Sequence, residues 1–229
     1  MTPEVRRQLI DWADKYNDPV YFQEDPIAFP RHFAQSGASL QDIEIAAVFA
    51  SHLAWGRRSM IVRDCRRLFD EMQWKPFDYV MGSCWRDEPA SIHRTVKWSD
   101  IAAICRSLRD FYSHEDSLES LSAKEMRVRI FSQKPDPKAP DKKINMMRRW
   151  LVRRDGRVDL GVWTHTSPSE LLIPLDVHVY DTAVKLGLTS RRSRDITTAR
   201  EITDAFGEIF PDDPAKGDFA LFGYGIDNA

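Results

Sequence analysis

The residues with the clearest chemical potential are an aspartate and two lysines in two separate segments. Asp176 interrupts the apolar stretch LIPLDVHVYD (172–181) directly before an expected helix. Lys142 and Lys143 open another expected helix in DKKINMMRRW (141–150), whose other face carries Ile, Met and Trp. A carboxylate before a helix has an ordinary role, because it caps free backbone N–H groups and stabilises the helix by about 1 kcal/mol. If an amine lies beside it, the same carboxylate could form a catalytic pair with that amine.

The two lysines stand at the end of a helix that is unfavourable for ammonium groups, because the helix dipole favours anions there. A lysine at that end and next to a second ammonium has its neutral form favoured, and a neutral amine is nucleophilic near pH 7. Solvated side chains near a helix start are the ordinary alternative. The sequence therefore predicts that Asp176 is a helix cap and also the acid of a lysine–aspartate pair, with Lys142 or Lys143 as the amine.

Positive charge gathers around these segments, although the whole chain has a formal net charge of −2. That net charge argues against indiscriminate binding to nucleic acid. Residues 142–157 nevertheless hold seven Lys or Arg against one Asp, and residues 191–200 hold a second group of arginines. A solvated helix face is the alternative interpretation of either run. Two runs that flank the candidate acid predict a phosphate-binding surface.

Composition excludes several classes of protein. The three cysteines are far apart and lack CxxC spacing, so we expect free or buried thiols in a reducing compartment, and no iron–sulfur cluster. The six histidines lack metal-ligand spacing, and we expect no metal and no cofactor. No apolar run approaches the roughly 20 residues needed to cross a bilayer. The acidic N-terminus does not resemble a signal peptide, so a cytoplasmic location with no membrane partner is expected.

Helical periodicity dominates the chain, and no run alternates with period two for long enough to demand a sheet. A segment with Asp25-Pro26 and Phe29-Pro30 and the segment 132–141, with three prolines, are expected loops. We expect an all-α protein with two helical lobes around a cleft, the lobes being 1–131 and 142–229. Helices are expected at residues 3–16, from 40 to about 56, and at 57–73, 76–83, 98–113, 115–121, 142–153, 177–186, 195–209 and 214–223.

Three stretches, in this order, resemble the helix-hairpin-helix DNA glycosylase superfamily. Endonuclease III-type enzymes carry a lysine at the start of the second hairpin helix and V-D-T-H before a later helix, and the 8-oxoguanine glycosylases carry P-V-D-V-H. This chain has KKIN at 142–145, PLDVH at 174–178 and GDFALFG at 217–223. Together with HLAWGRR (52–58) and HRTVKWSDI (93–101), these stretches are similar to an uncharacterised bacterial "domain of unknown function" family within that superfamily. The resemblance implies one glycosylase-like unit over residues 1–229.

The resemblance also implies roles for particular residues. Lys142 matches the nucleophile that forms a Schiff base, with Lys143 as the alternative, and Asp176 matches the carboxylate that assists attack at C1′. Met146 falls where those enzymes place a side chain against the extruded base. The other substrate-binding positions are Asp218 and Phe222, which resemble the base-reading pair of the archaeal 8-oxoguanine enzymes, together with Trp55 and His178. Core packing is the alternative for Trp55 and Phe222.

One departure concerns the usual L-P-G-V-G hairpin, whose backbone amides hold a DNA phosphate, because this chain has KPDPKAPDKK instead. Phosphate contacts must then come from a helix N-terminus or from basic side chains. The expected contacts are Lys138, Arg148, Arg149, Arg153, Arg191 and Arg192.

The sequence and the resemblance together predict a monomeric DNA repair glycosylase with AP lyase activity. Its partner would be double-stranded DNA of the nucleoid carrying a damaged base, with oxidised purines among the candidate lesions. One alternative is a DNA-binding protein that has the same fold without the chemistry. Another is a small-molecule or RNA enzyme that reuses the cleft.

Overall fold

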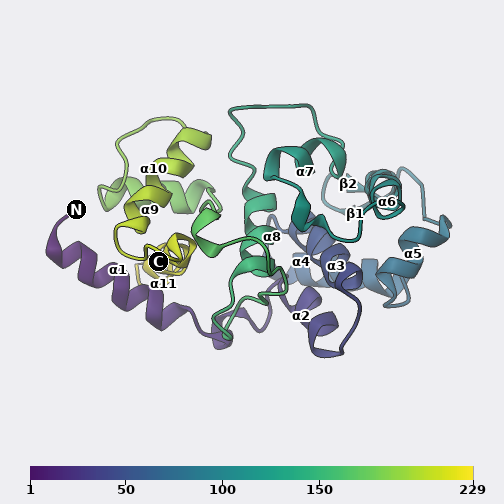
Figure 1. Cartoon of the computed structure of the whole chain (residues 1–229), viewed down its shortest axis with the longest axis horizontal. Helices are drawn as coiled ribbons and strands as arrows, with labels where there is room; N and C mark the ends of the chain where they lie inside the picture. Colours follow the sequence, from purple (N-terminus) through teal and green to yellow (C-terminus); the bar gives the residue numbers. More distant parts are fainter. Residues whose placement is uncertain (229) are drawn as a thin grey trace. The chain divides into compact units, whose positions relative to one another are not determined.

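Helices account for most of the chain (Figure 1). The computed structural model describes residues 1–228, which form eleven α-helices, four short 3-10 helices and one antiparallel hairpin. The all-α prediction is therefore confirmed. The α-helices are α1 Pro3–Tyr16, α2 Ala28–Gln35, α3 Leu40–Leu53, α4 Arg58–Glu71, α5 Pro76–Gly82, α6 Trp98–Tyr112, α7 Ala123–Arg129, α8 Lys142–Val152, α9 Val177–Lys185, α10 Ile196–Gly207 and α11 Gly217–Asp227. The hairpin strands are β1 Ser91–His93 and β2 Val96–Lys97, and the 3-10 helices are Pro19–Phe22, Leu118–Ser120, Pro168–Glu170 and Pro214–Lys216.

The chain divides into two compact units. The first unit combines Met1–Tyr21 with the part of the chain from Asp136 onward, and the second is Phe22–Pro135. The proline-rich segment 132–141 contains one of the two boundaries, as the sequence indicated. The expected lobe 1–131 differs from these units, because its first helix packs with the C-terminal half of the chain.

Helix α1 belongs to the first unit because its apolar face packs on α11. Trp12 meets the ring of Tyr224 edge-on at 5.1 Å between ring centroids, and Tyr16 meets Phe222 in the same way at 6.0 Å. The two helices approach closely at Gly223, where an added Cβ would lie 2.0 Å from Cδ2 of Tyr16. A glycine is therefore required at this position by the approach of the two helices.

Helix α8 carries much of the first unit's core, since Ile144, Met147 and Trp150 are buried along one side of it. The helix starts where Asp141 adopts a left-handed backbone with φ of 47°, and Nδ2 of Asn145 donates to the Pro140 carbonyl at 2.8 Å. This local structure fixes the position of the first residue of α8, Lys142.

Helix α3 is the core of the second unit, and every residue from Ile43 to Ser51 is buried. A helix that is apolar on all sides is typical of a fully enclosed element. Its one buried acid, Glu44, accepts hydrogen bonds from the hydroxyls of Tyr112 (2.8 Å) and Ser117 (2.6 Å). The backbone N–H of Leu118 is a third donor, at 3.1 Å.

Several expected boundaries were wrong. The segment with Phe29-Pro30 is helical as α2, because a proline near a helix start loses no intrahelical hydrogen bond. The expected helix 115–121 contains only a 3-10 turn, and α7 follows it behind a capping box formed by Ser122 and Glu125. The hairpin of β1 and β2 has too few residues to show an alternating pattern.

Candidate functional site

Asp176 and Lys142 lie together in the first unit. Asp176 caps α9, since its Oδ1 accepts from the backbone N–H of Val179 at 2.9 Å. Its other oxygen, Oδ2, lies 3.7 Å from Nζ of Lys142, and these side chains are 35% and 29% exposed. One carboxylate therefore serves both as a helix cap and as the partner of an amine, and both groups are open to a ligand.

Lys143 differs from Lys142 in its surroundings. Burial, with a smaller contribution from the charge of Lys142, lowers the pKa of Lys143 to about 8. Roughly a tenth of such an amine is neutral at pH 7, far more than for an ordinary lysine. The site thus offers two adjacent amines, one that is close to the carboxylate and one that loses its proton more easily.

A second carboxylate, Asp218, lies in the first turn of α11 and is paired with the guanidinium of Arg149. Burial raises the pKa of Asp218, the guanidinium of Arg149 lowers it, and the charge of Asp176 raises it further. Lys142 also acts on Asp218 electrostatically. Asp218, in the first turn of α11, therefore lies within electrostatic reach of Lys142 at the start of α8 and of Asp176 at the cap of α9.

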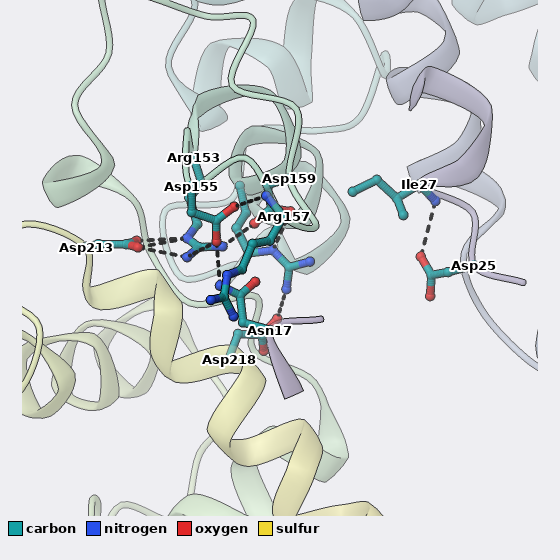
Figure 2. A network of polar contacts seen from close by, with 10 residues as sticks. Asn17, Asp25, Ile27, Arg153, Asp155, Arg157, Asp159, Asp213 and Asp218 are labelled. Atoms are coloured by element: carbon teal, nitrogen blue, oxygen red, sulfur yellow. Dashed lines mark hydrogen bonds and ion pairs between the residues drawn. The ribbon is translucent and has the colours of Figure 1, made fainter. Parts of the chain in front are cut away.

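Arg149 belongs to a larger buried network that continues through Asp159 to Arg153 (Figure 2). Arg153 is 1% exposed, and its Nε donates to Asp213 at 2.9 Å while a terminal nitrogen donates to Asp155 at 3.1 Å. Figure 2 shows the guanidinium of Arg153 among these carboxylates. Burial lowers the pKa of Arg153, but the surrounding carboxylates outweigh it and raise that pKa overall. The network holds α8 against the turn that follows it and against the approach to α11.

This burial corrects two expected phosphate contacts. Arg149 is 4% exposed and Arg153 is 1% exposed, and both guanidinium groups are occupied by carboxylates. A guanidinium that is buried and bonded to carboxylates does not reach a phosphate at the surface. The basic run from 142 to 157 is therefore divided, with half-buried Arg148 outside the network and 5.9 Å from the ring centroid of Trp163.

The second basic run, residues 191–200, lies beside Lys138 and α9 in the first unit. The backbone N–H of Ile196, at the start of α10, donates to the Lys138 carbonyl at 2.9 Å. The hydroxyl of Tyr180, on α9, donates to the Arg191 carbonyl at 2.8 Å. Lys138 and Arg192 are exposed, while the Arg191 side chain bonds to Asp195 at 3.1 Å and to Thr198. Lys138, Arg191 and Arg192 thus form a cationic edge beside α9, the helix that Asp176 caps.

The remaining expected residues have varied positions. Met146 is half-buried on α8, one turn after Lys142, and His178 is exposed in the first turn of α9. Phe222 is half-buried on α11 and packs edge-on against Tyr16, in keeping with the core-packing alternative.

Trp55 lies in the second unit. Its ring is covered by the guanidinium of Arg94 at 4.4 Å, and its carbonyl oxygen lies 2.9 Å from Nε2 of His93. The other ring nitrogen of His93 contacts Oδ2 of Asp64 at 2.8 Å, and both of these side chains are buried. This dyad connects the turn at Trp55 with α4 and with the hairpin.

A family model described as "Protein of unknown function (DUF2400)" matches residues 25–132 and 122–227, which together cover most of the chain. The chain belongs to this family. The match spans α8, α9 and α11, which supply Lys142, Asp176 and Asp218, and also the hairpin and α4. Neither the curated proteins nor the solved structures contain a match to the chain.

Three further features concern metal binding, membrane spans and the cysteine thiols. Within residues 1–228, no group of three or more His, Cys, Asp or Glu side chains is placed to hold a metal ion. None of the described helices has both the length and the apolar content to span a bilayer. All three cysteines are free thiols, with Cys65 and Cys105 buried.

Sequence reasoning missed the partners in the buried network. Asp159 and Asp213 lie in loops, and nothing in their spacing links them to α8. Asn17 bonds to Asp155 across a long stretch of sequence, which also left no pattern. The available signal was the cluster of arginines at the end of α8 and directly after it, which indicates internal partners; these are Arg148, Arg149, Arg153 and Arg154.

Proposed function

We propose that this DUF2400 protein is a DNA glycosylase with AP lyase activity, of helix-hairpin-helix glycosylase architecture, that acts through Lys142 and Asp176. The observation that carries the proposal is the 3.7 Å approach of Nζ of Lys142 to Oδ2 of Asp176, at the starts of two helices. The ordered resemblance of these positions to the lysine and aspartate of known glycosylases supports it. An oxidised purine is the first substrate class to test, because the GDFALFG segment resembles the base-reading segment of archaeal 8-oxoguanine enzymes.

The proposed reaction begins with extrusion of the damaged nucleotide, which costs a few kcal/mol and least for a damaged or mispaired base. Neutral Lys142 forms a bond to C1′, and the bond from C1′ to the base breaks with its electron pair leaving on the base, which takes up a proton. Asp176 stabilises the positive charge that develops on the sugar. Transfer of a proton to the ring oxygen opens the sugar and leaves an iminium on Lys142. Loss of the 2′ proton then expels the 3′ phosphate by β-elimination.

Asp176 serves as a base for Lys142, and Lys143 is a second candidate nucleophile. The carboxylate of Asp176 can accept a proton from the ammonium of Lys142 when a substrate excludes water from the pair. Lys143, with a pKa of about 8, is the alternative nucleophile.

The phosphate contacts in this proposal come from the cationic edge of the first unit. Lys138, Arg148, Arg191 and Arg192 remain in the set after Arg149 and Arg153 are removed from it. The segment before α8 lacks the glycine-rich turn of known glycosylases, so charged side chains must do most of the anchoring. Affinity for DNA should then fall steeply with salt, because each phosphate contact releases counterions.

A DNA-binding protein without chemistry is the second candidate, favoured by a specific observation. Asp176 already has a complete structural role as the cap of α9 and as the ion-pair partner of Lys142. If the protein only binds DNA, substitution of Asp176 changes its stability, and there is no enzymatic activity for the substitution to abolish.

Trapping with borohydride separates the two candidates. The protein is incubated with duplex oligonucleotides that carry 8-oxoguanine, uracil, an oxidised pyrimidine or an abasic site, and borohydride reduces any iminium to a stable adduct. We expect an adduct that is lost in Lys142→Ala, while Lys185→Ala, an exposed lysine on α9, behaves as wild type. If only Lys143→Ala abolishes it, the nucleophile is Lys143. An absent adduct with retained salt-sensitive binding would refute the enzyme and leave the binding protein.

A further inference from the structure

The second unit contains a cavity of about 710 Å³ that the glycosylase proposal does not use. One wall is aromatic, formed by Phe29, His32 and Trp74, and the other is a stripe of α4. Ser59, Val62, Arg63 and Arg66 repeat at the spacing of one helix face, so that the stripe presents its side chains together. The volume is within the range of pockets that take small molecules.

The aromatic wall is built at a cost in backbone strain. Gln73 and Trp74 both have a left-handed backbone, with φ of 51° and 54°. A residue other than glycine is strained in that region, and such outliers gather where a ligand is held. The strained turn holds the indole of Trp74 with Nε1 donating to Asp70 at 2.9 Å.

Three aromatic rings meet at this wall and leave one surface toward the cavity. Trp74 lies at 23° to Phe29 with centroids 6.2 Å apart, and the ring of His32 stands 5.0 Å from it at 68°. Phe29 is buried, whereas Trp74 is half-buried and His32 is exposed. A flat aromatic ligand can stack on the ring of Trp74 and meet the ring of His32 at its edge.

The helical wall presents guanidinium groups that are held in place and still available. Nε of Arg63 donates to Asp64 at 2.8 Å, and Asp64 is itself 1% exposed and fixed by His93. The terminal nitrogens of Arg63 make no hydrogen bond within residues 1–228, and Arg66 has no ion pair there. A planar guanidinium group can donate two parallel hydrogen bonds to two oxygens of one phosphate. Glu24, at the rim, can accept a hydrogen bond from a base or sugar.

From this geometry we infer that the cavity between α2 and α4 binds one nucleotide unit. Its base stacks on Trp74 and meets the ring of His32 edge-on, and its phosphate lies on Arg63 and Arg66. The unit comes either from a free nucleoside monophosphate or from single-stranded nucleic acid. The inference does not rest on the glycosylase proposal, because Lys142 and Asp176 are in the other unit.

Calorimetric titration of the full-length protein tests the site with four probes: deoxyadenosine monophosphate, deoxyadenosine, inorganic phosphate and a short single-stranded oligonucleotide. We expect the monophosphate to bind at least tenfold more tightly than deoxyadenosine or phosphate, since both halves of the site contribute. A stoichiometric complex with the oligonucleotide, tighter than that with the monophosphate, would identify single-stranded nucleic acid as the source. Tighter binding of the monophosphate would identify the free nucleotide.

Matched variants locate the binding. Arg66→Gln should weaken the monophosphate about tenfold, while Arg57→Gln, an exposed arginine at the cap of α4 outside the cavity, should leave it unchanged. His32→Ala should weaken both the monophosphate and the oligonucleotide. Equal losses in the Arg57 and Arg66 variants, or no binding of either nucleotide probe at millimolar concentration, would overturn the inference.

Discussion

Substitution of Asp176 separates its two roles because asparagine and alanine remove different parts of it. Asparagine caps a helix about as well as aspartate, whereas alanine loses about 1 kcal/mol of capping. The ion pair with Lys142, at 3.7 Å, has a Coulomb energy between about 1 kcal/mol in water and about 4 kcal/mol at a protein surface. Both side chains are about one-third exposed, so the net contribution to folding should stay below about 1 kcal/mol.

We therefore expect urea unfolding to place Asp176→Asn within about 0.5 kcal/mol of wild type, and Asp176→Ala about 1 kcal/mol below Asp176→Asn. Both variants should lose the borohydride adduct, because neither can stabilise positive charge on the sugar. Asp181→Asn, an exposed acid on the same helix, is the control for a change in charge. Wild-type adduct formation by the folded Asp176→Asn protein would refute the pairing, and equal destabilisation by asparagine and alanine would refute the cap.

Three other predictions concern stability, each measured by urea unfolding. Lys143 has a folded-state pKa near 8, which is below the pKa of a lysine in the unfolded chain. Between these two pKa values the unfolded state binds more protons than the folded state, so the free energy of unfolding should rise with pH across this window. Lys143→Met should therefore stabilise the protein at pH 7 by up to about 3 kcal/mol and lose that advantage by pH 10. Glu44→Ala should cost about 3 kcal/mol, because three donors lose a buried acceptor, and a loss below 1 kcal/mol would contradict this. Gly223→Ala should cost at least about 2 kcal/mol by driving a methyl into Tyr16, whereas Gly207→Ala, with no atom within 4 Å of the added Cβ, should be neutral or slightly stabilising.

The buried arginines explain why charge counting overestimated the DNA-binding surface. Seven basic residues in residues 142–157 look like a cationic face when only the sequence is available. Two of them, Arg149 and Arg153, turn inward because Asp213 and Asp218 supply carboxylates from distant parts of the chain and Asp159 supplies one from the turn after α8. Such pairing depends on tertiary contacts, and no local spacing encodes it. The cationic edge that remains is smaller and combines two segments.

The sequence by itself determined the helices and the two residues that matter most for the proposed chemistry. Period-3.6 patterns and capping residues are local, so α1, α3, α4, α6, α8, α9 and α10 could be predicted from neighbouring residues alone. The role of Asp176 as a cap followed in the same way, because an N-cap bonds within its own first turn.

Only the tertiary structure decided which side chains meet. The approach of Lys142 to Asp176, the passage of α1 to the C-terminal unit and the inward turn of Arg149 all join residues that are far apart in the chain. Each depends on which apolar faces pack together and on where buried charges find partners. Packing and charge pairing act through space between residues of any sequence separation, so a single sequence shows the groups that need partners and leaves the partners undecided.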